Sequence, residues 1–533
     1  MSYYVKETVV QSGDGTENSP FKTLDEVFKT LKTTVEQKID YKIFMNSSEG
    51  YKEVSKAQIK KFKKNYLTKP AKIIKDETSL MEEKFESVVL DDSLQHAIYC
   101  HLNKLSQSVG QRFLVKGRVQ HLRKQSKKLW FLTLRDGTGY LQCVLEDKLC
   151  KIKEASQLER ECSVAIYGTV KELPADNKTV GGIELIADFW ELIGGVERAG
   201  GIESVVNADS EPDVQFNNRH LMIRGENTSK TILMQSFAFE AFRKFYKNGG
   251  FSETAPPTIV QTQCEGGSTL FKFDYFGEDA YLSQSSQLYL ETLVPVLGNC
   301  FCITRSYRAE KSRTRRHLSE YNHIEAELDF ISFDDLLTHI EDMLVSVSKL
   351  ALEIGGSTLL DVNPNYKPLE KPFCRMEYKD AIKFLDEHNI CKAEGGKYEF
   401  GDDIPEAAER RMTDIINKPI MLTRFPVELK AFYMAKCHDD PRVTESVDVL
   451  IPGVGEIVGG SMRIWDSKEL LAGYARENLD PTPYYWYTDM RAFGSSPHGG
   501  YGLGFERFLT WMLDKEHIRD VCLYPRYTGR CEP

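Results

Sequence analysis

Five strand-length segments, separated by turns, follow one another between residues 110 and 195. The second and third are joined by RDGTG, which suits a tight hairpin. Five short strands in about 85 residues are typical of a small closed β-barrel of the oligonucleotide-binding type, the OB fold. The segments are residues 113–123, 127–136, 139–147, 162–173 and 182–193. This stretch therefore predicts an all-β domain that separates the chain before it from the chain after it.

The segment after residue 225 is longer and mixes helical with strand-like patterns. Residues 237–251 have a helical pattern that ends in glycines, and Ser332 with Asp335 forms a capping-box pattern ahead of another helix. Strand-like runs lie at 322–331, 444–451 and 456–465. Because strands and helices do not alternate regularly, the pattern predicts an α+β fold. The apolar face expected on the second helix comprises Leu336, Ile340, Met343, Leu344 and Val347.

The first 75 residues have the pattern of a small separate module, with strand-like runs at 3–10 and 42–46. From Tyr51 to Leu80 there are nine lysines against three acids. These lysines fit either a solvated helix or an electrostatic handle for an RNA backbone. The expected domains are a lysine-rich N-terminal extension (1–75), a linker (76–97), the β-barrel (98–196), a hinge (197–225) and the α+β domain (226–533).

Composition excludes several classes of protein. The chain has 69 basic and 79 acidic side chains, a net charge of −10, which argues against a general nucleic-acid coat but hides local basic patches. We find no run of about 18 apolar residues that would predict a membrane span, and MSYYVKETVV does not have the pattern of a secretory signal. The twelve cysteines lack a C-x-x-C motif, so we expect no disulfide framework or zinc site, a cytosolic location, and a strand or core position for Cys300 and Cys302.

Three polar clusters in the α+β segment point to phosphate chemistry. Between residues 305 and 316, six basic side chains accompany one acid, Glu310, and such cations suit a triphosphate. Asp448 and Glu456 lie in glycine-rich, strand-like sequence and could bind Mg²⁺. Arg507 follows glycines at a helix start and could stack on a base. From the residues alone, a solvated basic loop, two structural acids and a salt-bridged core arginine remain open alternatives. A P-loop or dinucleotide fingerprint does not occur.

The order of these clusters, together with EGG at 265–267 and QSSQ at 284–287, resembles the three sequence motifs of class II aminoacyl-tRNA synthetases. Within the aspartyl, asparaginyl and lysyl subgroup, the cytoplasmic asparaginyl enzymes of eukaryotes resemble the chain over nearly its whole length. The resemblance implies an antiparallel sheet with flanking helices, preceded by an OB-fold anticodon-binding barrel and a small N-terminal extension. It also implies a homodimer with Pro257 at the interface.

The resemblance assigns many of the polar residues to ATP. Arg308 would hold the α-phosphate and the amino-acid carboxylate, Arg316 and His317 would lie near the γ-phosphate, and Tyr321 and Arg507 would lie against the two faces of the adenine. Glu310 would contact the tRNA acceptor end or the adenine side. The expected ATP-binding residues are Arg308, Glu310, Arg316, His317, Leu318, Tyr321, Glu456 and Arg507; the catalytic ones are Arg308, Glu456 and Arg507, and the Mg²⁺ ligands are Asp448 and Glu456.

The amino-acid pocket is assigned in the same way. Glu265 and Gln287 match positions that hold the substrate ammonium group, and Arg463 matches the arginine that meets the substrate side chain. Aspartyl enzymes carry a lysine where this chain has Leu290, and an aspartate where it has Glu325. We therefore expect Arg463 to face Glu325, which would accept N–H bonds from asparagine and repel aspartate by about 4 kcal/mol at about 4 Å. These residues favour asparagine; an aspartyl or non-discriminating enzyme is the alternative.

In the barrel, Phe131 matches a residue that stacks on an anticodon base, and Gln142 and Glu184 match base-reading positions. Strand alternation alone leaves open whether Phe131 is instead a core residue. The implied activity is ATP-dependent ligation of L-asparagine to tRNA(Asn) through an asparaginyl-adenylate. Two rival classes are a synthetase-like protein that has lost catalysis, which would need a broken motif, and an asparagine-synthetase-like paralogue, which would lack the barrel.

Overall fold

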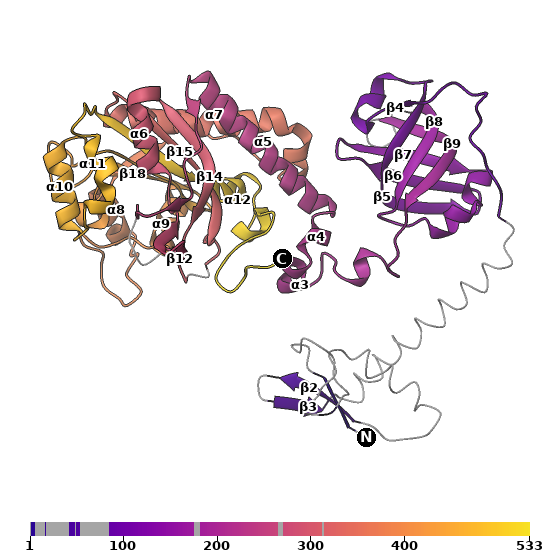
Figure 1. The fold of residues 1–533 in the computed structure, drawn as a ribbon, viewed down its shortest axis with the longest axis horizontal. Helices are drawn as coiled ribbons and strands as arrows, with labels where there is room; N and C mark the ends of the chain where they lie inside the picture. Colours follow the sequence, from indigo (N-terminus) through magenta and orange to yellow (C-terminus); the bar gives the residue numbers. More distant parts are fainter. Residues whose placement is uncertain are drawn as a thin grey trace. The chain divides into compact units, whose positions relative to one another are not determined.

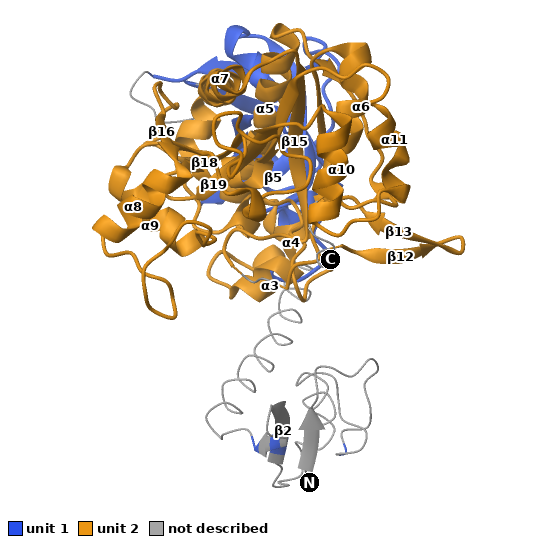
Figure 2. Ribbon diagram, turned by 90° about the vertical axis from the view of Figure 1, so that its left-hand side faces the viewer, with its two compact units in different colours: residues 1–201 blue, residues 202–533 orange. Residues whose placement is uncertain are grey.

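The structure is a computed structural model that describes residues 2–5, 16, 42–47, 50–53, 85–174, 182–264, 270–311 and 314–533. The chain divides into two compact units, residues 1–201 and 202–533 (Figure 2). The division falls inside the segment 197–225 that the sequence predicts as a hinge. The finer boundaries proposed above stay predictions.

The barrel of the first unit is closed because strand β5 pairs with both β6 and β8. The remaining contacts run β6–β7–β9–β8, and β4 adds a parallel edge to β5 (Figure 1). The strands are β4 (Ile98–Tyr99), β5 (Arg112–Ser126), β6 (Leu129–Arg135), β7 (Tyr140–Glu146), β8 (Ser163–Glu172) and β9 (Ile183–Gly194). This confirms the predicted five-stranded OB-type barrel and its hairpin between β6 and β7.

Alternation along β6 decides which side chains fill the barrel. Trp130, Leu132 and Leu134 are buried in the core, whereas Phe131 and Thr133 between them are only half-buried. Successive side chains of a strand point to opposite faces. Phe131 therefore lies on the outer face, which removes the alternative that it is a core residue.

The N-terminal part of the first unit contains a three-stranded sheet of β1 (Ser2–Val5), β2 (Lys42–Ser47) and β3 (Gly50–Glu53). β1 pairs parallel with β2, and β2 pairs antiparallel with β3. The strand-like run at 42–46 is thus confirmed, and so is the beginning of the run at 3–10, whose residues 6–10 lie outside the described residues. The lysines between residues 56 and 75 lie outside the described residues, and their role stays a prediction.

The second unit is built on an eight-stranded sheet that is antiparallel except at its two ends, where β10–β14 and β16–β17 are parallel. In spatial order its strands are β10 (Ser252–Glu253), β14 (Cys300–Tyr307), β15 (Glu320–Asp329), β20 (His498–Gly504), β19 (Gly455–Met462), β18 (Ser446–Ile451), β17 (Ile420–Thr423) and β16 (Cys374–Glu377). The chain between β10 and α6 (Gln287–Leu297) forms a separate small sheet. Its strands, in spatial order, are β11 (Ile259–Val260), β13 (Glu278–Leu282) and β12 (Lys272–Tyr275). This confirms the α+β prediction, and Cys300 and Cys302 are buried in β14 as expected.

Two long helices, α5 and α7, pack along one another and against the sheet (Figure 1). The helices are α3 (Pro212–Asn217), α4 (Arg219–Met222), α5 (Glu226–Asn248), α6 (Gln287–Leu297), α7 (Phe333–Val362), α8 (Tyr378–Glu387), α9 (Glu406–Ile416), α10 (Ser467–Arg476), α11 (Tyr485–Asp489) and α12 (Phe505–Met512). Ser332 and Asp335 form the predicted capping box at the start of α7. The five predicted apolar residues of α7 are all in the core or nearly so.

Helix α7 is interrupted at one of its glycines. Gly356 has φ 43° and ψ −123°, a conformation that side chains disfavour, but the chain re-enters helical geometry and continues to Val362. By length and apolar composition α7 is the one helix among the described residues that could span a membrane. Its buried side chains instead belong to the core against the sheet.

The other face of the sheet carries polar side chains, and β15 shows why. Ile324, Ala326 and Leu328 are buried in the core with α5 and α7. Because side chains alternate, Glu325 and Glu327 point to the opposite face, where α6 packs on β14, β15 and β20. Carboxylates are thereby presented on a rigid strand within a concave surface.

Candidate active site

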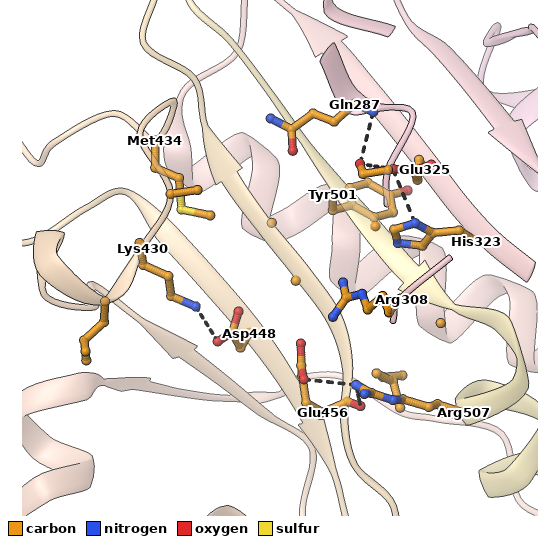
Figure 3. Close-up of a pocket in the computed structure, with 18 of the residues that line it drawn as sticks. Gln287, Arg308, His323, Glu325, Lys430, Met434, Asp448, Glu456, Tyr501 and Arg507 are labelled. Carbon is orange, nitrogen blue, oxygen red and sulfur yellow. Dashed lines mark hydrogen bonds and ion pairs between the residues drawn. The ribbon is translucent and has the colours of Figure 1, made fainter. Parts of the chain in front are cut away.

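A cavity of about 840 Å³ opens on this polar face (Figure 3). Its walls come from β15, β18, β19 and β20, from the helices α6, α9, α10 and α12, and from the loop that follows β14. The sequence-predicted residues that line it are Gln287, Arg308, Arg316, His317, Leu318, Tyr321, Glu325, Asp448, Glu456, Arg463 and Arg507. Glu310 lies beside the cavity, 3.9 Å from Arg308 and 3.7 Å from His317. Glu265 lies outside the described residues.

One end of the cavity is rich in cations. The guanidinium carbon of Arg308 lies 5.8 Å from the centre of the Tyr321 ring. Arg316 is almost buried and pairs with Glu406 at 3.2 Å and Glu409 at 3.6 Å, both on α9. Burial and the nearby charge of Arg507 lower the pKa of His317. Cations held in this way by a low-dielectric wall suit a polyphosphate.

Arg507 lies in the first turn of α12, and its side chain lines this end of the cavity. Its Nη1 donates to the backbone oxygen and to Oε2 of Glu456, both at 3.0 Å (Figure 3). Burial would raise the pKa of Glu456, but Arg507 and then Arg316 outweigh it and hold that pKa at about 2. Glu456 is therefore an anion at neutral pH, and its geometry orients the Arg507 guanidinium.

Asp448 and Glu456 point toward the same spot. A Cβ placed on Gly459 would lie 3.6 Å from Oδ1 of Asp448 and 3.6 Å from Oε1 of Glu456. Lys430 donates to Oδ2 of Asp448 at 2.6 Å. Burial, with repulsion from these two carboxylates, raises the pKa of Glu409 to about 8. Two converging carboxylates fit a Mg²⁺ ion that takes its remaining ligands from substrate phosphates and water, and no complete set of three such ligands occurs among the described residues.

The amino-acid end differs from the sequence prediction in one pairing. Arg463 does not pair with Glu325; its Nη2 and Nε donate to Glu327 at 2.5 and 3.3 Å, and its Nη1 donates to Ser461 at 2.8 Å. The reason is tertiary: Gly500 of β20 lies between Glu327 and Ser461 in the sheet register, and a Cβ there would collide with the Glu327 carboxylate. Because Gly500 has no side chain, the Arg463 guanidinium can reach the Glu327 carboxylate.

Glu325 instead faces the start of α6. It accepts from the Ser285 hydroxyl at 2.5 Å and from the Ser286 backbone N–H at 3.0 Å, and it lies 3.4 Å from His323 (Figure 3). Leu290 is fully buried in a cluster with Val294, Cys300 and Cys302, and is not part of the cavity lining. The side chain at position 290 therefore packs behind the wall of the pocket and does not form part of the pocket surface.

Sequence reasoning missed a buried ionic layer behind Arg463. Glu291 on α6 binds Arg491 at 2.8 Å and His498 at 3.1 Å, and all three side chains are nearly or fully buried. Burial would raise the pKa of Glu291, but Arg491 and then His498 hold it below its usual range. Burial raises the pKa of Glu327 to about 7 against the pull of Arg463. The available signal was a glutamate inside the apolar helix QLYLETLVPVL, since such an acid needs a buried partner.

On the barrel, the three predicted anticodon residues share one face. Gln142 pairs with Glu184 across β7 and β9, and its Nε2 donates to the Glu184 carboxylate at 3.1 Å. Phe131 lies on the neighbouring strand opposite Val144. The guanidinium of Arg123 lies 4.6 Å from the Phe131 ring centre. An aromatic platform, a hydrogen-bonding pair and a cation form the kind of surface that binds unstacked bases.

Sequence models of three families match the chain. The model described as tRNA synthetases class II (D, K and N) matches residues 211–528, and an OB-fold nucleic acid binding domain matches residues 113–193. An asparaginal-tRNA synthetase N-terminal domain matches residues 16–97. The antiparallel sheet, the barrel and the cation-lined cavity are thus those of a class II tRNA synthetase.

Individual relatives show which group of class II tRNA synthetases the chain is most like in sequence and structure. The cytoplasmic asparagine–tRNA ligase of Bos taurus is 53% identical over 98% of this chain and 95% of its own length. That of Saccharomyces cerevisiae is 45% identical over the whole of both. The solved Entamoeba histolytica asparaginyl-tRNA synthetase in complex with asparaginyl-adenylate has a TM-score of 0.77 and 46% identity, and covers 82% of this chain and all of its own. The chain belongs to the family of cytoplasmic asparaginyl-tRNA synthetases.

Proposed function

We propose that this protein ligates L-asparagine to tRNA(Asn) in the cytosol, using ATP and forming an asparaginyl-adenylate. The observation that carries the proposal is one cavity that joins a cationic end, at Arg308 and Arg507, to a buried end at Arg463. The solved relative that holds asparaginyl-adenylate supports the intermediate. The motif residues are intact and gathered in one place, which disfavours a protein that has lost catalysis.

The reaction needs charge neutralisation and positioning more than proton transfer. The substrate carboxylate attacks the α-phosphorus of ATP in line, and pyrophosphate leaves. Arg308 neutralises charge on the α-phosphate and orients the carboxylate, Arg316 binds the leaving phosphates, and Arg507 covers the adenine. Asp448 and Glu456 would hold Mg²⁺, which screens the charge of the phosphates when bound. A terminal ribose hydroxyl of tRNA then attacks the carbonyl carbon of the asparaginyl-adenylate; an ester to the ribose forms, the acyl–phosphate bond breaks, and AMP leaves as the hydroxyl loses its proton.

The pocket selects asparagine over aspartate because the Arg463 guanidinium is already paired with a carboxylate of the protein. Glu327 already neutralises Arg463 through two hydrogen bonds. The guanidinium can still donate to an amide oxygen, whereas an aspartate carboxylate finds no unbalanced positive charge there and lies near Glu325 as well. An aspartyl or non-discriminating enzyme is the alternative, and it would need a second cation at this end.

We further propose that two copies of the chain associate through the segment that contains Pro257, as the resemblance to class II synthetases implies. Ile259, two residues later, leaves 47% of its surface exposed within one chain. An apolar residue this close to Pro257 fits a surface that a second copy covers.

ATP–pyrophosphate exchange tests the function directly, with Asn, Asp and Lys supplied in parallel and without tRNA. We expect exchange with Asn alone, because only a neutral side chain matches the balanced Arg463. Strong exchange with Asp would establish the alternative enzyme. No exchange with any of the three, repeated with tRNA present, would contradict synthetase activity.

The anticodon surface gives a prediction for tRNA alone. Phe131→Ala should raise the KM for tRNA about 5- to 150-fold, because a stacked base contributes about 1–3 kcal/mol. Pyrophosphate exchange without tRNA should stay unchanged, since the barrel does not line the cavity. Tyr167→Ala, which changes a half-buried aromatic on β8, a strand that pairs with neither β6 nor β7, serves as the matched control. Equal effects of both variants would contradict a specific role for Phe131.

A further inference from the structure

The carboxylate of Glu291 has two differently engaged oxygens. Oε2 accepts three hydrogen bonds, from the Tyr487 hydroxyl at 2.8 Å, from Nη2 of Arg491 at 2.8 Å and from Nε2 of His498 at 3.1 Å. Glu291, Tyr487 and Arg491 have fully buried side chains. Three donors from two other segments therefore fix this carboxylate in one orientation.

The second oxygen, Oε1, faces the cavity. It accepts a hydrogen bond from Nε2 of Gln287 at 3.0 Å, and it lies 3.9 Å from Nε of Arg463. Both of these partners line the cavity, whereas Glu291 itself does not. The bond from one N–H of Gln287 to Glu291 fixes the orientation of the amide, with the nitrogen on the Glu291 side and the amide oxygen on the opposite side.

We propose that Glu291 is the positioning residue of the amino-acid pocket: it turns the amide oxygen of Gln287 toward the substrate ammonium group and steadies Arg463 toward the substrate side chain. This inference deepens the proposed function and rests on it. An ammonium group needs acceptors, and an amide turned the other way would present N–H donors to it. Glu291 thus links both ends of the substrate through one buried carboxylate.

Glu291→Gln tests the inference because it keeps size and removes the second acceptor oxygen. The new amide oxygen should stay with the three donors Tyr487, Arg491 and His498, which turns the amide nitrogen toward Gln287, so Gln287 must rotate or give up its bond. We expect the KM for Asn in pyrophosphate exchange to rise about 10-fold or more, while the KM for ATP changes less than about twofold. Glu341→Gln is the matched control: Glu341 is also buried, accepts the Phe373 N–H, and lies outside the cavity.

A double-mutant cycle separates positioning from a merely structural role. Because Glu291 acts partly through Gln287, Glu291→Gln should raise the KM for Asn by a smaller factor in Gln287→Ala than it does in the wild-type protein. Full additivity, or equal rises in the KM for Asn and for ATP, would overturn the inference. If Glu291→Gln does not fold, Tyr487→Phe removes one of the three anchoring donors and should raise the KM for Asn in the same direction.

The reference is exchange by the wild-type protein. Absence of wild-type exchange with Asn would contradict the proposed function itself. Wild-type exchange together with an unchanged KM for Asn in both Glu291→Gln and Tyr487→Phe would overturn the positioning role and leave the function standing.

Discussion

Arg308→Ala is expected to lower the rate of ATP–pyrophosphate exchange about 10²- to 10³-fold. Arg308 comes directly after β14, and its guanidinium lies in the cavity beside Tyr321. The proposed function places the α-phosphate of ATP at this point. Charge builds on that phosphate in the transition state, and one preorganised donor at such a site is worth about 2.7–4 kcal/mol. The loss should fall mainly on kcat, because the contact strengthens as charge develops.

Arg305→Ala is the matched control for this prediction. Arg305 lies on β14, three residues before Arg308; it is about half exposed, pairs with Glu320 at 3.6 Å and does not line the cavity. Its loss should change exchange less than about threefold, since exposed ion pairs contribute little. Arg308→Ala exchange within threefold of wild type would contradict the assignment of Arg308 to the phosphate.

Arg463→Ala is expected to lower kcat/KM for Asn at least about 10²-fold, because it removes a buried, charge-assisted contact to the substrate. It also leaves Glu327 buried without its cation, so the free energy of unfolding should fall by about 3–5 kcal/mol. Exchange kinetics at saturating ATP and thermal unfolding measure the two effects separately.

Two variants separate binding from stability at this site. Arg463→Lys keeps the charge beside Glu327 but loses the planar fork, so it should recover stability without recovering Asn activation. Leu290→Ala should do the reverse: it empties buried space outside the cavity lining, lowering stability by about 2–5 kcal/mol while keeping the preference for Asn. Normal Asn activation by Arg463→Ala would show that another group binds the substrate side chain.

Much of the fold could be predicted from local patterns in the sequence. The five barrel segments and the α7 capping box rest on alternation and on hydrogen bonds between residues close in sequence, so they could be read directly. The continuation of α7 past Gly356 could not, because it depends on Leu359 packing into the core. Alternation also left Phe131 undecided, since either face of β6 could have been inward.

For the site, the sequence by itself determined which residue types are present and, through the family resemblance, which of them meet. Arg308, Glu456 and Arg507 gather in one cavity as expected. The partner of Arg463 was decided only by the tertiary structure, because Glu325 and Glu327 share one face of β15 and the space above Gly500 selects between them. The anchoring of Glu291 was likewise hidden, since Arg491 and His498 lie some two hundred residues away and buried ion pairs are formed by folding rather than by spacing.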